Sequence, residues 1–340
     1  MSTPRIGILD QSPIISGSEP RQAIAETLKL AQAADRLGYH RYWLAEHHSI
    51  AALGDPCPEV LAVRVASVTE RIRVGSGGVL LPYYSPLKVA EVFRMLEAMF
   101  PGRIDLGIGR APGGDQRTAL AMSPDGSGHL LAAEHFPRQV VDLVGYLDGG
   151  MPADHPFARV KVQPAGAGAP EIWLLGSSDY SGALAAYLGL RFAFANLISA
   201  HGGDMVMREY RKDFKPSGRE AKPTSALAVF VICADSADEA ERLAASIDLR
   251  RVRMDQGIDL QQPNHEEAAS HRYSPPEEAR RKANRNRIVI GAPDAVRDRL
   301  SAMLAAAAAD ELIVISITGD YASRLRSYEL LACAFGLPGG

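Results

Sequence analysis

The sequence of 340 residues is long enough for one large barrel or for two ordinary domains, and length alone does not decide between them. With 46% hydrophobic and 23% charged residues, the composition is that of a soluble globular protein. The net charge of −3 gives no reason to expect nucleic acid or an anionic membrane as a partner.

The cysteines and the start of the chain indicate the compartment. Cys57, Cys233 and Cys333 are odd in number and far apart, which fits a reducing compartment better than a disulfide scaffold. No CxxC pair is present for zinc. No signal peptide is recognisable, and the longest helix-like apolar run, residues 302–309, is too short to cross a bilayer. We therefore expect a cytoplasmic enzyme.

Short apolar runs alternate with segments of helical periodicity along the chain. The predicted strands cover residues 5–9, 41–45, 72–81, 103–108, 171–175, 191–195, 224–234, 288–290 and 312–317. The predicted helices cover residues 20–37, 59–69, 88–100, 129–147, 177–188, 200–214, 293–308 and 321–335, and a further helix starts at an Asp235 or Ser236 cap and runs towards Met254. This alternation predicts a (β/α)8 TIM barrel, a single domain over residues 1–340, and not a doubly wound sheet.

Three segments interrupt the alternation. Residues 111–128 are rich in Gly, Asp, Ser and Pro and predict a long, mobile loop. Residues 151–168 form an excursion with a short predicted strand at 159–162. Residues 255–286 are polar, mixed in charge and interrupted by three prolines, which is typical of a solvated surface insertion.

In a barrel of this kind the working residues lie at the C-terminal ends of the strands. Those ends carry one cation and two hydroxyls suited to a phosphate, glycines that allow close contact with a ring, and one histidine pair. The positions are Asp10–Ser12, Glu46–His48, Ser76–Gly78, Gly109–Arg110, Gly176–Ser178 and Asn196.

The serine pair at residues 177 and 178 precedes a helix, so its hydroxyls and the amides of Asp179 and Tyr180 are expected to face an anion. The alternative is a plain serine N-cap. Arg110 favours the anion site, because a guanidinium at the neighbouring strand end can bind phosphate with two parallel hydrogen bonds.

His47 and His48 point to opposite sides if they continue a strand, so both cannot face one substrate. A metal site is the alternative, but neither an HExxH motif nor a second histidine cluster at another strand end is present, and we expect no metal. For Gly77 and Gly78, a β-bulge is the alternative to a ligand contact.

Four segments together carry a family resemblance that spans nearly the whole chain, and they follow one another in the order that this family requires. They are Gly38–His48, Arg71–Gly114, Ile172–Ser178 and Ile290–Pro293. The chain resembles the luciferase-like flavin-dependent monooxygenases, a TIM-barrel group that includes the bacterial luciferases. The resemblance implies that the phosphate of FMN contacts Arg110 and Ser178, with Gly176, Ser177 and Tyr180 nearby.

The resemblance also places Ser76, Gly77 and Gly78 beneath the isoalloxazine ring, often with a non-prolyl cis peptide at Gly77–Gly78. It makes His47 the catalytic residue, as a general base or a hydrogen-bonding group beside the peroxide, while His48 orients its neighbours. It further suggests that residues 255–286 are a mobile lid over the barrel mouth rather than a passive insertion.

The activity implied is a monooxygenase reaction in which O2 adds at C4a of reduced FMN and the C4a-peroxyflavin oxidises a small organic substrate, such as an aldehyde or alkane-like compound. No GxGxxG follows a strand, so a separate NAD(P)H:flavin reductase is expected to supply the reduced FMN, and a homodimer is expected. The alternatives are hydride transfer with the deazaflavin F420, for which the single Arg110 offers few cations, and a flavin-binding protein without turnover.

The chain departs from the luciferases at two of these positions. They carry an acidic residue where this chain has Ser177, and a serine there accepts a phosphate more readily. They carry a reactive cysteine where this chain has Gly109, which leaves more room beside the flavin.

Overall fold

In the described part of the chain, nine parallel strands form one sheet, and eight of them close into a ring. The structure, a computed structural model, describes residues 4–123, 134–166 and 168–339. Neighbours pair in the order β6-β5-β4-β3-β2-β1-β9-β7, and the pairing of β6 with β7 closes the barrel. The ring strands are β1 (Arg5–Asp10), β2 (Arg41–Leu44), β3 (Arg73–Leu80), β4 (Ile104–Gly109), β5 (Glu171–Gly176), β6 (Arg191–Ala195), β7 (Ser225–Cys233) and β9 (Glu311–Ile315).

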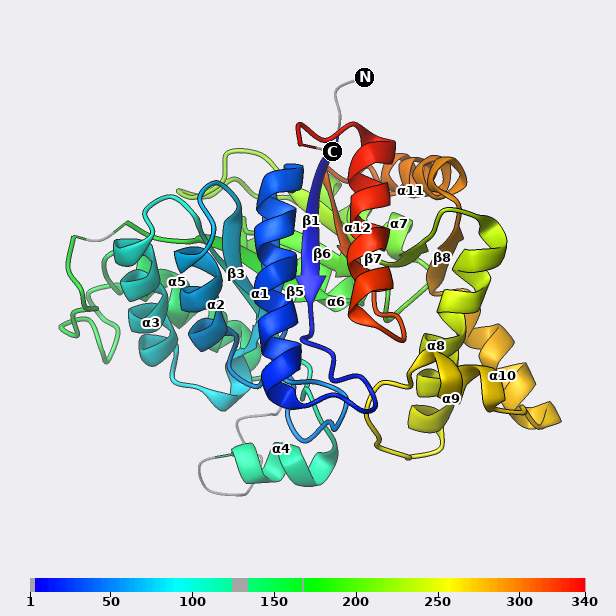
Figure 1. Ribbon diagram of the computed structural model, residues 1–340. Coiled ribbons are helices and arrows are strands. Elements are labelled where there is room, and N and C mark those ends of the chain that lie inside the picture. The colour runs from blue at the N-terminus through cyan, green and yellow to red at the C-terminus, as the bar shows by residue number, and fades with distance from the viewer. Residues whose placement is uncertain (1–3, 124–133, 167, 340) are drawn as a thin grey trace.

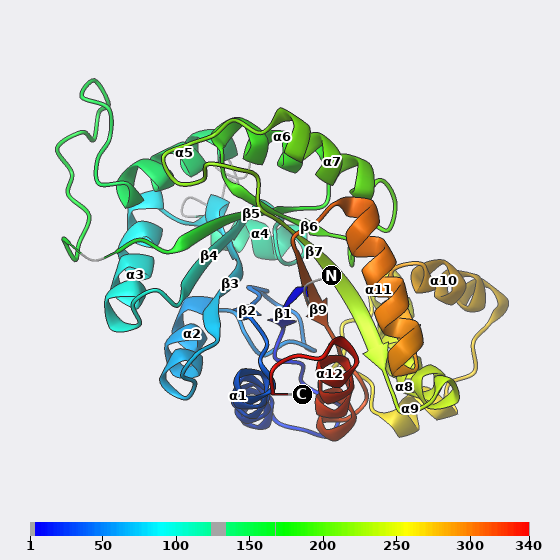
Figure 2. The same cartoon turned by 90° about the horizontal axis from the view of Figure 1, so that it is seen from above.

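Helices surround this ring, as Figure 2 shows in a view along the barrel. The helices of the described residues are α1 (Pro20–Leu37), α2 (Pro58–Ser67), the 3-10 turn η1 (Leu81–Tyr83), α3 (Pro86–Met99), α4 (Gln116–Met122), α5 (Phe136–Leu147), α6 (Asp179–Leu188), α7 (Gly203–Asp213), α8 (Ala237–Asp255), α9 (His265–Ser270), α10 (Pro275–Arg285), α11 (Pro293–Ala307) and α12 (Tyr321–Phe335). Figure 1 shows that α4 lies beneath the barrel and that α9 and α10 lie beside α8. The predicted (β/α)8 TIM barrel is confirmed. None of the described helices is both long and apolar enough to cross a membrane.

Local signals set many of the helix boundaries. Pro20 occupies the first turn of α1, where its missing N–H costs no hydrogen bond. Gly38 ends the helix with φ of 85°, a left-handed conformation that a residue without Cβ adopts easily. The Ser236 side chain accepts the N–H of Glu239 and caps α8, as the sequence predicts.

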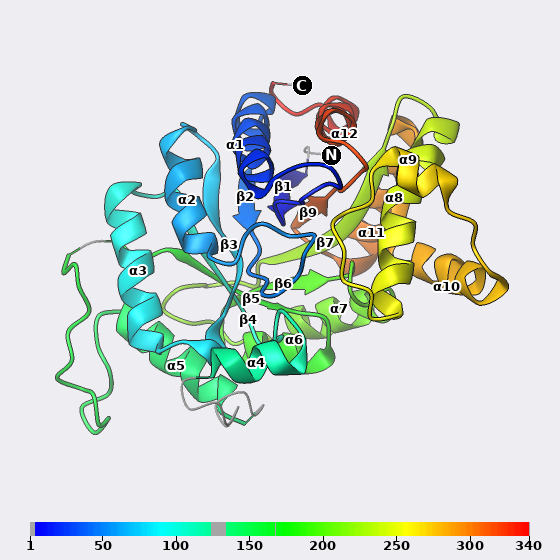
Figure 3. The same ribbon diagram turned by 60° about the horizontal axis from the view of Figure 1, so that its bottom comes forward.

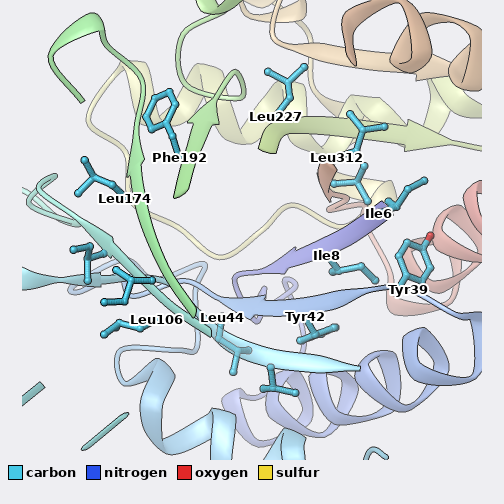
Figure 4. Packing of buried hydrophobic residues seen from close by; sticks show 14 of the residues in the cluster. Ile6, Ile8, Tyr39, Tyr42, Leu44, Leu106, Leu174, Phe192, Leu227 and Leu312 are labelled. Carbon is cyan, nitrogen blue, oxygen red and sulfur yellow. The ribbon is translucent and has the colours of Figure 1, made fainter. Parts of the chain in front are cut away.

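Two apolar layers hold the barrel together. The outer layer lies between strands and helices and contains residues such as Ile6, Ile8 and Leu44 (Figure 4). The inner layer lies inside the ring and includes Leu9 and Trp43, and the same apolar cluster continues outside the ring to residues of α8. Because side chains alternate along each strand, one strand supplies both layers, and Leu9 therefore points inward while Ile8 points outward.

One strand lies outside the ring, contrary to the expectation that residues 288–290 return to it. β8 (Ile288–Gly291) pairs only with the C-terminal half of β7, from Phe230 to Cys233. The first half of β7 pairs with β9, which takes the closing position. The sheet therefore extends sideways beyond the barrel, and Figure 1 shows β8 to the right of the ring strands, beside α8.

The three interrupting segments differ in part from their predictions. The predicted loop at 111–128 contains α4, which Asp115 caps by accepting the N–H of Thr118; residues 124–128 of that loop and 129–133 of the next predicted helix lie outside the described residues. No strand forms at 159–162, where the chain makes turns without a pairing partner. The polar segment 255–286 contains α9 and α10, and Arg285 ties α10 to Asp248 of α8.

Candidate active site

A cavity of about 360 Å³ opens among the C-terminal ends of the strands, at the end of the barrel that faces the viewer in Figure 3. Its size lies within the roughly 300–1,000 Å³ that is typical of small-molecule sites. Apolar residues of the barrel interior, including Trp43, Ala228 and Ile313, form its floor. Polar groups lie at its rim, and Arg110 is the one lysine or arginine among the described residues that line it.

Glycines of β3 shape one wall. The Gly77–Gly78 peptide bond is cis, as the resemblance implied, and the register between β3 and β4 shifts between Ser76 and Val79, an irregularity of the kind that a β-bulge produces. A Cβ at Gly77 would lie 2.8 Å from both Leu9 Cδ1 and Trp43 Cβ. No larger residue fits there, and the wall stays flat enough for a planar ring.

The part of the cavity at Arg110 and Ser178 presents groups that can bind an anion. The Arg110 guanidinium carbon lies 4.8 Å from the centre of the Tyr180 ring, a cation–π contact that orients the side chain. Ser178 is the N-cap residue of α6, but its hydroxyl makes no capping hydrogen bond and instead lies 3.4 Å from the Ser181 hydroxyl. The alternative of a plain serine cap is therefore wrong for Ser178, and its hydroxyl remains available to a ligand.

Asp179 occupies one of the amides at the N-terminus of α6. Its carboxylate accepts the N–H of Tyr180 at 2.8 Å, so one of the helix amides expected to face an anion already has a partner. A phosphate at this position would compete with the exposed carboxylate for the N-terminal amides.

The adjacent residues His47 and His48 have different surroundings. Nε2 of His48 lies 2.7 Å from Glu46, which also accepts the hydroxyl of Tyr84 at 2.6 Å and the N–H of Leu80 at 2.8 Å. The Glu46 carboxylate thus binds three different elements together and fixes the His48 ring. His48 is not part of the cavity wall, whereas His47 is.

His47 has a free ring nitrogen. Its Nδ1 is buried and has no hydrogen-bond partner within the described part of the chain. Burial lowers the pKa of His47 to about 4, and the positive charge of Arg250 contributes to the shift. The imidazole is therefore neutral at physiological pH, so it can both donate and accept a hydrogen bond in the cavity.

Asp55 lies behind His47. Its backbone carbonyl accepts the His47 N–H at 3.3 Å, and its Oδ1 accepts the N–H of Cys57 at 3.2 Å. Oδ2 is buried without a partner among the residues described. Burial raises the pKa of Asp55 to about 7, so the carboxyl carries its proton over much of the acidic range.

Most predicted site residues meet at this cavity. Those that line it are His47, Gly77, Gly78, Arg110, Gly176, Ser177 and Ser178. Two do not. The Ser76 side chain is fully buried and donates to the Gly107 carbonyl at 2.8 Å, so it does not line the cavity. Tyr180 supports Arg110 from outside the cavity wall.

Three further polar residues line the cavity: Gln11 and Glu46, which belong to the predicted strand-end positions but had no role assigned, and Ser181, which the prediction missed. Gln11 and Glu46 stand at strand ends, where the sequence already concentrated polar groups. Ser181 lies one helical turn after Ser178, and that spacing of three was the available signal. No group of three His, Cys, Asp or Glu residues suited to a metal ion occurs in the described ranges.

Comparison with known proteins gives consistent matches over the whole length. The family model described as luciferase-like monooxygenase matches residues 5–311. A luciferase-like monooxygenase of Escherichia coli (strain K12) is 40% identical over 323 residues, 95% of this chain and 94% of that protein. An N-acetyl-S-alkylcysteine monooxygenase of Bacillus subtilis (strain 168) is 34% identical over 333 residues, 97% of this chain and 98% of that protein.

A solved structure and a more distant relative extend these matches. The crystal structure of apo-MsnO8 has a TM-score of 0.90 and 40% identity, and the match covers 98% of each chain. The oxygenase component of the flavin-dependent trigonelline monooxygenase of Acinetobacter baylyi is 26% identical over 302 residues, 83% of this chain and 80% of that protein. Proteins similar to this chain thus include the oxygenase component of a flavin-dependent monooxygenase.

Proposed function

Because the chain belongs to the luciferase-like monooxygenase family, we propose that it is a flavin-dependent monooxygenase that oxidises a small organic substrate with reduced FMN and O2. One observation carries the proposal: a single cavity joins an anion-binding rim at Arg110 and Ser178 to a neutral imidazole at His47. The phosphate of a flavin needs the anion-binding rim, and oxygen chemistry at the edge of the flavin ring uses the imidazole.

The rim residues would hold the FMN phosphate. Arg110 can donate two parallel hydrogen bonds, and Ser177 and Ser178 add hydroxyl donors beside the N-terminus of α6. The wall at Gly77 and Gly78 admits the flavin ring because no side chain projects from it. The fit is chemical as well as steric, since the apolar floor suits an aromatic ring and the Arg110 guanidinium suits a phosphate.

Bound reduced FMN would supply the two electrons that place one oxygen atom of O2 in the substrate and release the other as water. His47 then acts as a hydrogen-bonding group at the cavity wall. Its pKa of about 4 makes it a weak base at neutral pH, which favours hydrogen bonding over general-base catalysis. The apolar floor excludes water from the reacting groups.

A separate NAD(P)H:flavin reductase would deliver the reduced FMN. The chain has no nicotinamide-binding motif of its own, and one relative is named as the oxygenase component of a flavin-dependent enzyme. The relative that acts on N-acetyl-S-alkylcysteines supports a small, polar organic substrate rather than a long alkane. We also propose that the protein works as a homodimer in the cytoplasm.

Oxygen uptake tests the proposal. The protein is mixed anaerobically with reduced FMN or with reduced F420, and O2 is then admitted while oxygen consumption and hydrogen peroxide are recorded. We expect protein-dependent oxygen consumption with reduced FMN and none with reduced F420. Hydride transfer from F420 to a carbonyl acceptor would establish the alternative activity, and binding of FMN without any oxygen consumption would indicate a flavin-binding protein.

Arg110→Ala tests the phosphate site. A charge-assisted hydrogen bond to phosphate contributes about 1.5–3 kcal/mol, so the variant should bind FMN roughly 10- to 150-fold more weakly. Titration of the protein with FMN, followed by flavin fluorescence, measures the change. Riboflavin, which lacks the phosphate, should bind wild type and variant equally. Arg117→Ala on α4 is the control, because this arginine does not line the cavity; unchanged FMN affinity in Arg110→Ala would contradict the assignment.

A further inference from the structure

Gln11, at the end of β1, presents a side-chain amide to the cavity. The residue lines the cavity and is half-buried. Its side chain makes no hydrogen bond with any residue that the structure describes. Its neighbours in sequence, Asp10 and Ser12, are by contrast fully buried, and both side chains are hydrogen-bonded. The amide of Gln11 is therefore the polar group of this segment that remains available to a ligand.

The register of the barrel places Gln11 just above the wall that suits a flavin ring. Leu9 of β1 pairs with Trp43 of β2, and both side chains lie against Gly77 of that wall. Side chains alternate along a strand, so Gln11 points inward as Leu9 does, two residues nearer the C-terminal end. The amide therefore lies on the mouth side of the wall at Gly77, where a substrate would meet a bound flavin.

Backbone hydrogen bonds join the segment of Gln11 to the loop of His47. The two acceptors flank Gln11 in the sequence, and the two donors flank His47. The bonds run from the Ala45 N–H to the Asp10 carbonyl at 3.0 Å and from the Gly54 N–H to the Ser12 carbonyl at 2.9 Å. Gln11 and His47, which both line the cavity, are therefore held on the same side of it.

The backbone at Ser12 is strained, and surrounding elements enforce its conformation. Its φ is 48°, in the left-handed region that a residue with a Cβ seldom adopts. Thr27 of α1 donates to the Ser12 hydroxyl at 2.9 Å, and the Ser12 N–H donates to the Asp10 carboxylate at 2.7 Å. Arg324 of α12 donates to the same carboxylate at 2.6 Å. Backbone strain that neighbouring elements maintain is concentrated at functional sites, and here it fixes the turn that carries Gln11.

The cavity offers a substrate no free cation beside Gln11. Arg110 is the one lysine or arginine among the described lining residues, and the FMN phosphate would occupy it under the proposed function. The Glu46 carboxylate already has three hydrogen-bond partners, and its side chain is 1% exposed. A carboxylate brought to Gln11 would lose its hydration without gaining a positive partner, whereas an uncharged polar group needs only a hydrogen bond.

We propose that Gln11 is a specificity-determining residue, whose side-chain amide binds an uncharged polar group of the organic substrate and holds the substrate beside His47. This inference rests on the proposed monooxygenase function and names the chemical class of the group that reaches the reaction site. A primary amide both donates and accepts hydrogen bonds, so it matches a carbonyl, hydroxyl or amide group. A charged group of the same substrate would lie towards the mouth of the cavity, where water solvates it.

Calorimetric titration of the FMN-saturated protein with hexanamide, hexanoate and 1-chlorohexane tests the proposal, because these probes share a six-carbon chain and differ in their polar group. We expect the wild type to bind hexanamide roughly 10-fold more tightly than hexanoate. Gln11→Met should bind hexanamide roughly 2- to 10-fold more weakly, as expected for one hydrogen bond between uncharged groups, and 1-chlorohexane at least as tightly as the wild type. Gln22→Met is the matched control, because this exposed glutamine of α1 does not line the cavity.

The affinity for FMN gives a second readout. Gln11→Met should bind FMN as tightly as the wild type, because the amide contacts the substrate; weaker FMN binding would overturn the proposal and assign Gln11 to the flavin. An equal loss of affinity for hexanamide and 1-chlorohexane would also overturn it, because a change in cavity shape affects both probes. So would unchanged hexanamide binding in Gln11→Met, or a wild type that binds hexanamide no more tightly than hexanoate. A failure of the proposed function itself would instead appear as absent FMN binding or absent oxygen uptake.

Discussion

At the scale of single residues, the hydrogen bonds of the site separate supporting groups from reactive ones. The Glu46 carboxylate binds His48, Tyr84 and the Leu80 N–H, so these groups are occupied in holding the loop. His47 keeps a buried nitrogen without a partner in the described chain. A polar group that stays unsatisfied beside a cavity is available to a ligand, and this difference assigns distinct roles to two identical, adjacent residues.

His47→Ala should reduce product formation by roughly 10- to 100-fold while leaving FMN affinity nearly unchanged, because it removes a hydrogen bond made only during oxygen chemistry. Oxygen consumption should persist and yield hydrogen peroxide. His48→Ala should act on the fold instead and lower the free energy of unfolding by about 1–3 kcal/mol, because Glu46 loses a partner. Simultaneous measurements of oxygen consumption and hydrogen peroxide, together with denaturant unfolding, distinguish the effects of the two variants. If His47→Ala forms as much product per O2 consumed as the wild type does, His47 has no role in the oxygen chemistry.

Asp55 predicts a pH dependence of stability with a definite sign. Its pKa is about 7 in the folded protein, above the usual value of about 3.8, so the folded state binds more protons between these limits. The contribution of Asp55 therefore destabilises the fold progressively as the pH rises from about 4 to 7. Asp55→Asn removes this effect and keeps an oxygen for the Cys57 N–H.

We expect Asp55→Asn to be more stable than wild type above pH 7, by at most about 4 kcal/mol, and to differ little near pH 4. Denaturant unfolding from pH 4 to 8 gives the difference directly. His40 and His47, whose pKa values are both lowered to about 4, act in the opposite direction, but they are common to both proteins and cancel. A difference in unfolding free energy between the two proteins that does not change with pH would show that Asp55 is ionised in the folded protein.

At the scale of elements, the polar segment 255–286 has two parts with different anchoring. α10 is held to α8 by Arg281 and Arg285 on Asp248, whose carboxylate is buried. The loop between α8 and α9 makes few ion pairs of this kind, and it exposes the side chains of Ile258 and Leu260. If the segment closes over the flavin, we expect the loop to move while α10 stays in place.

Limited proteolysis with thermolysin, which cuts before large apolar residues, tests the loop at Ile258 and Leu260. Reduced FMN should slow cleavage there several-fold under anaerobic conditions, because a closed loop loses the local opening that cleavage needs. Asp259→Ala should speed cleavage, since it releases the Ala51 N–H. Asp294→Ala on α11 is the control. Equal rates with and without reduced FMN would leave the segment as a surface insertion.

At the scale of the whole molecule, buried ion pairs connect the strands at the end of the barrel away from the cavity. Arg41 of β2 pairs with Asp105 of β4 and with Glu311 of β9, and all three side chains are buried. Trp43 donates to the same Asp105 carboxylate at 2.9 Å. These bonds connect strands that are far apart in the sequence, so we expect the chain to unfold as a single domain.

Arg41→Ala should lower the free energy of unfolding by about 3–5 kcal/mol, because it removes the buried cation that lies between the buried carboxylates of Asp105 and Glu311. Arg5→Ala is a matched control, since Arg5 lies 3.6 Å from the same Glu311 but is 63% exposed, and it should change stability by no more than about 1 kcal/mol. Calorimetry should show one transition for each protein. Two separate transitions in the wild type would mean that the barrel does not unfold as a unit.

The sequence by itself determined those features that depend on neighbouring residues. The bounds of α1 and α12 follow from helical periodicity and from Gly38 and Gly336 as left-handed stops, and the structure reproduces both helices as predicted. The order of strands and helices then implies the barrel, because parallel strands joined by helices bring their C-terminal ends to one face. This is why Arg110, Ser178 and His47 could be assigned to one site before their distances were known.

The tertiary structure alone decided which distant segments meet. Whether β8 or β9 closes the ring depends on long-range pairing that no local pattern encodes. The Ser76 hydroxyl turns to Gly107, and the charge of Arg250, on a helix some two hundred residues later in the chain, helps to lower the pKa of His47. Burial and pKa shifts arise from these encounters, since the desolvation and charge that a side chain experiences are properties of its surroundings in space rather than of its neighbours in sequence.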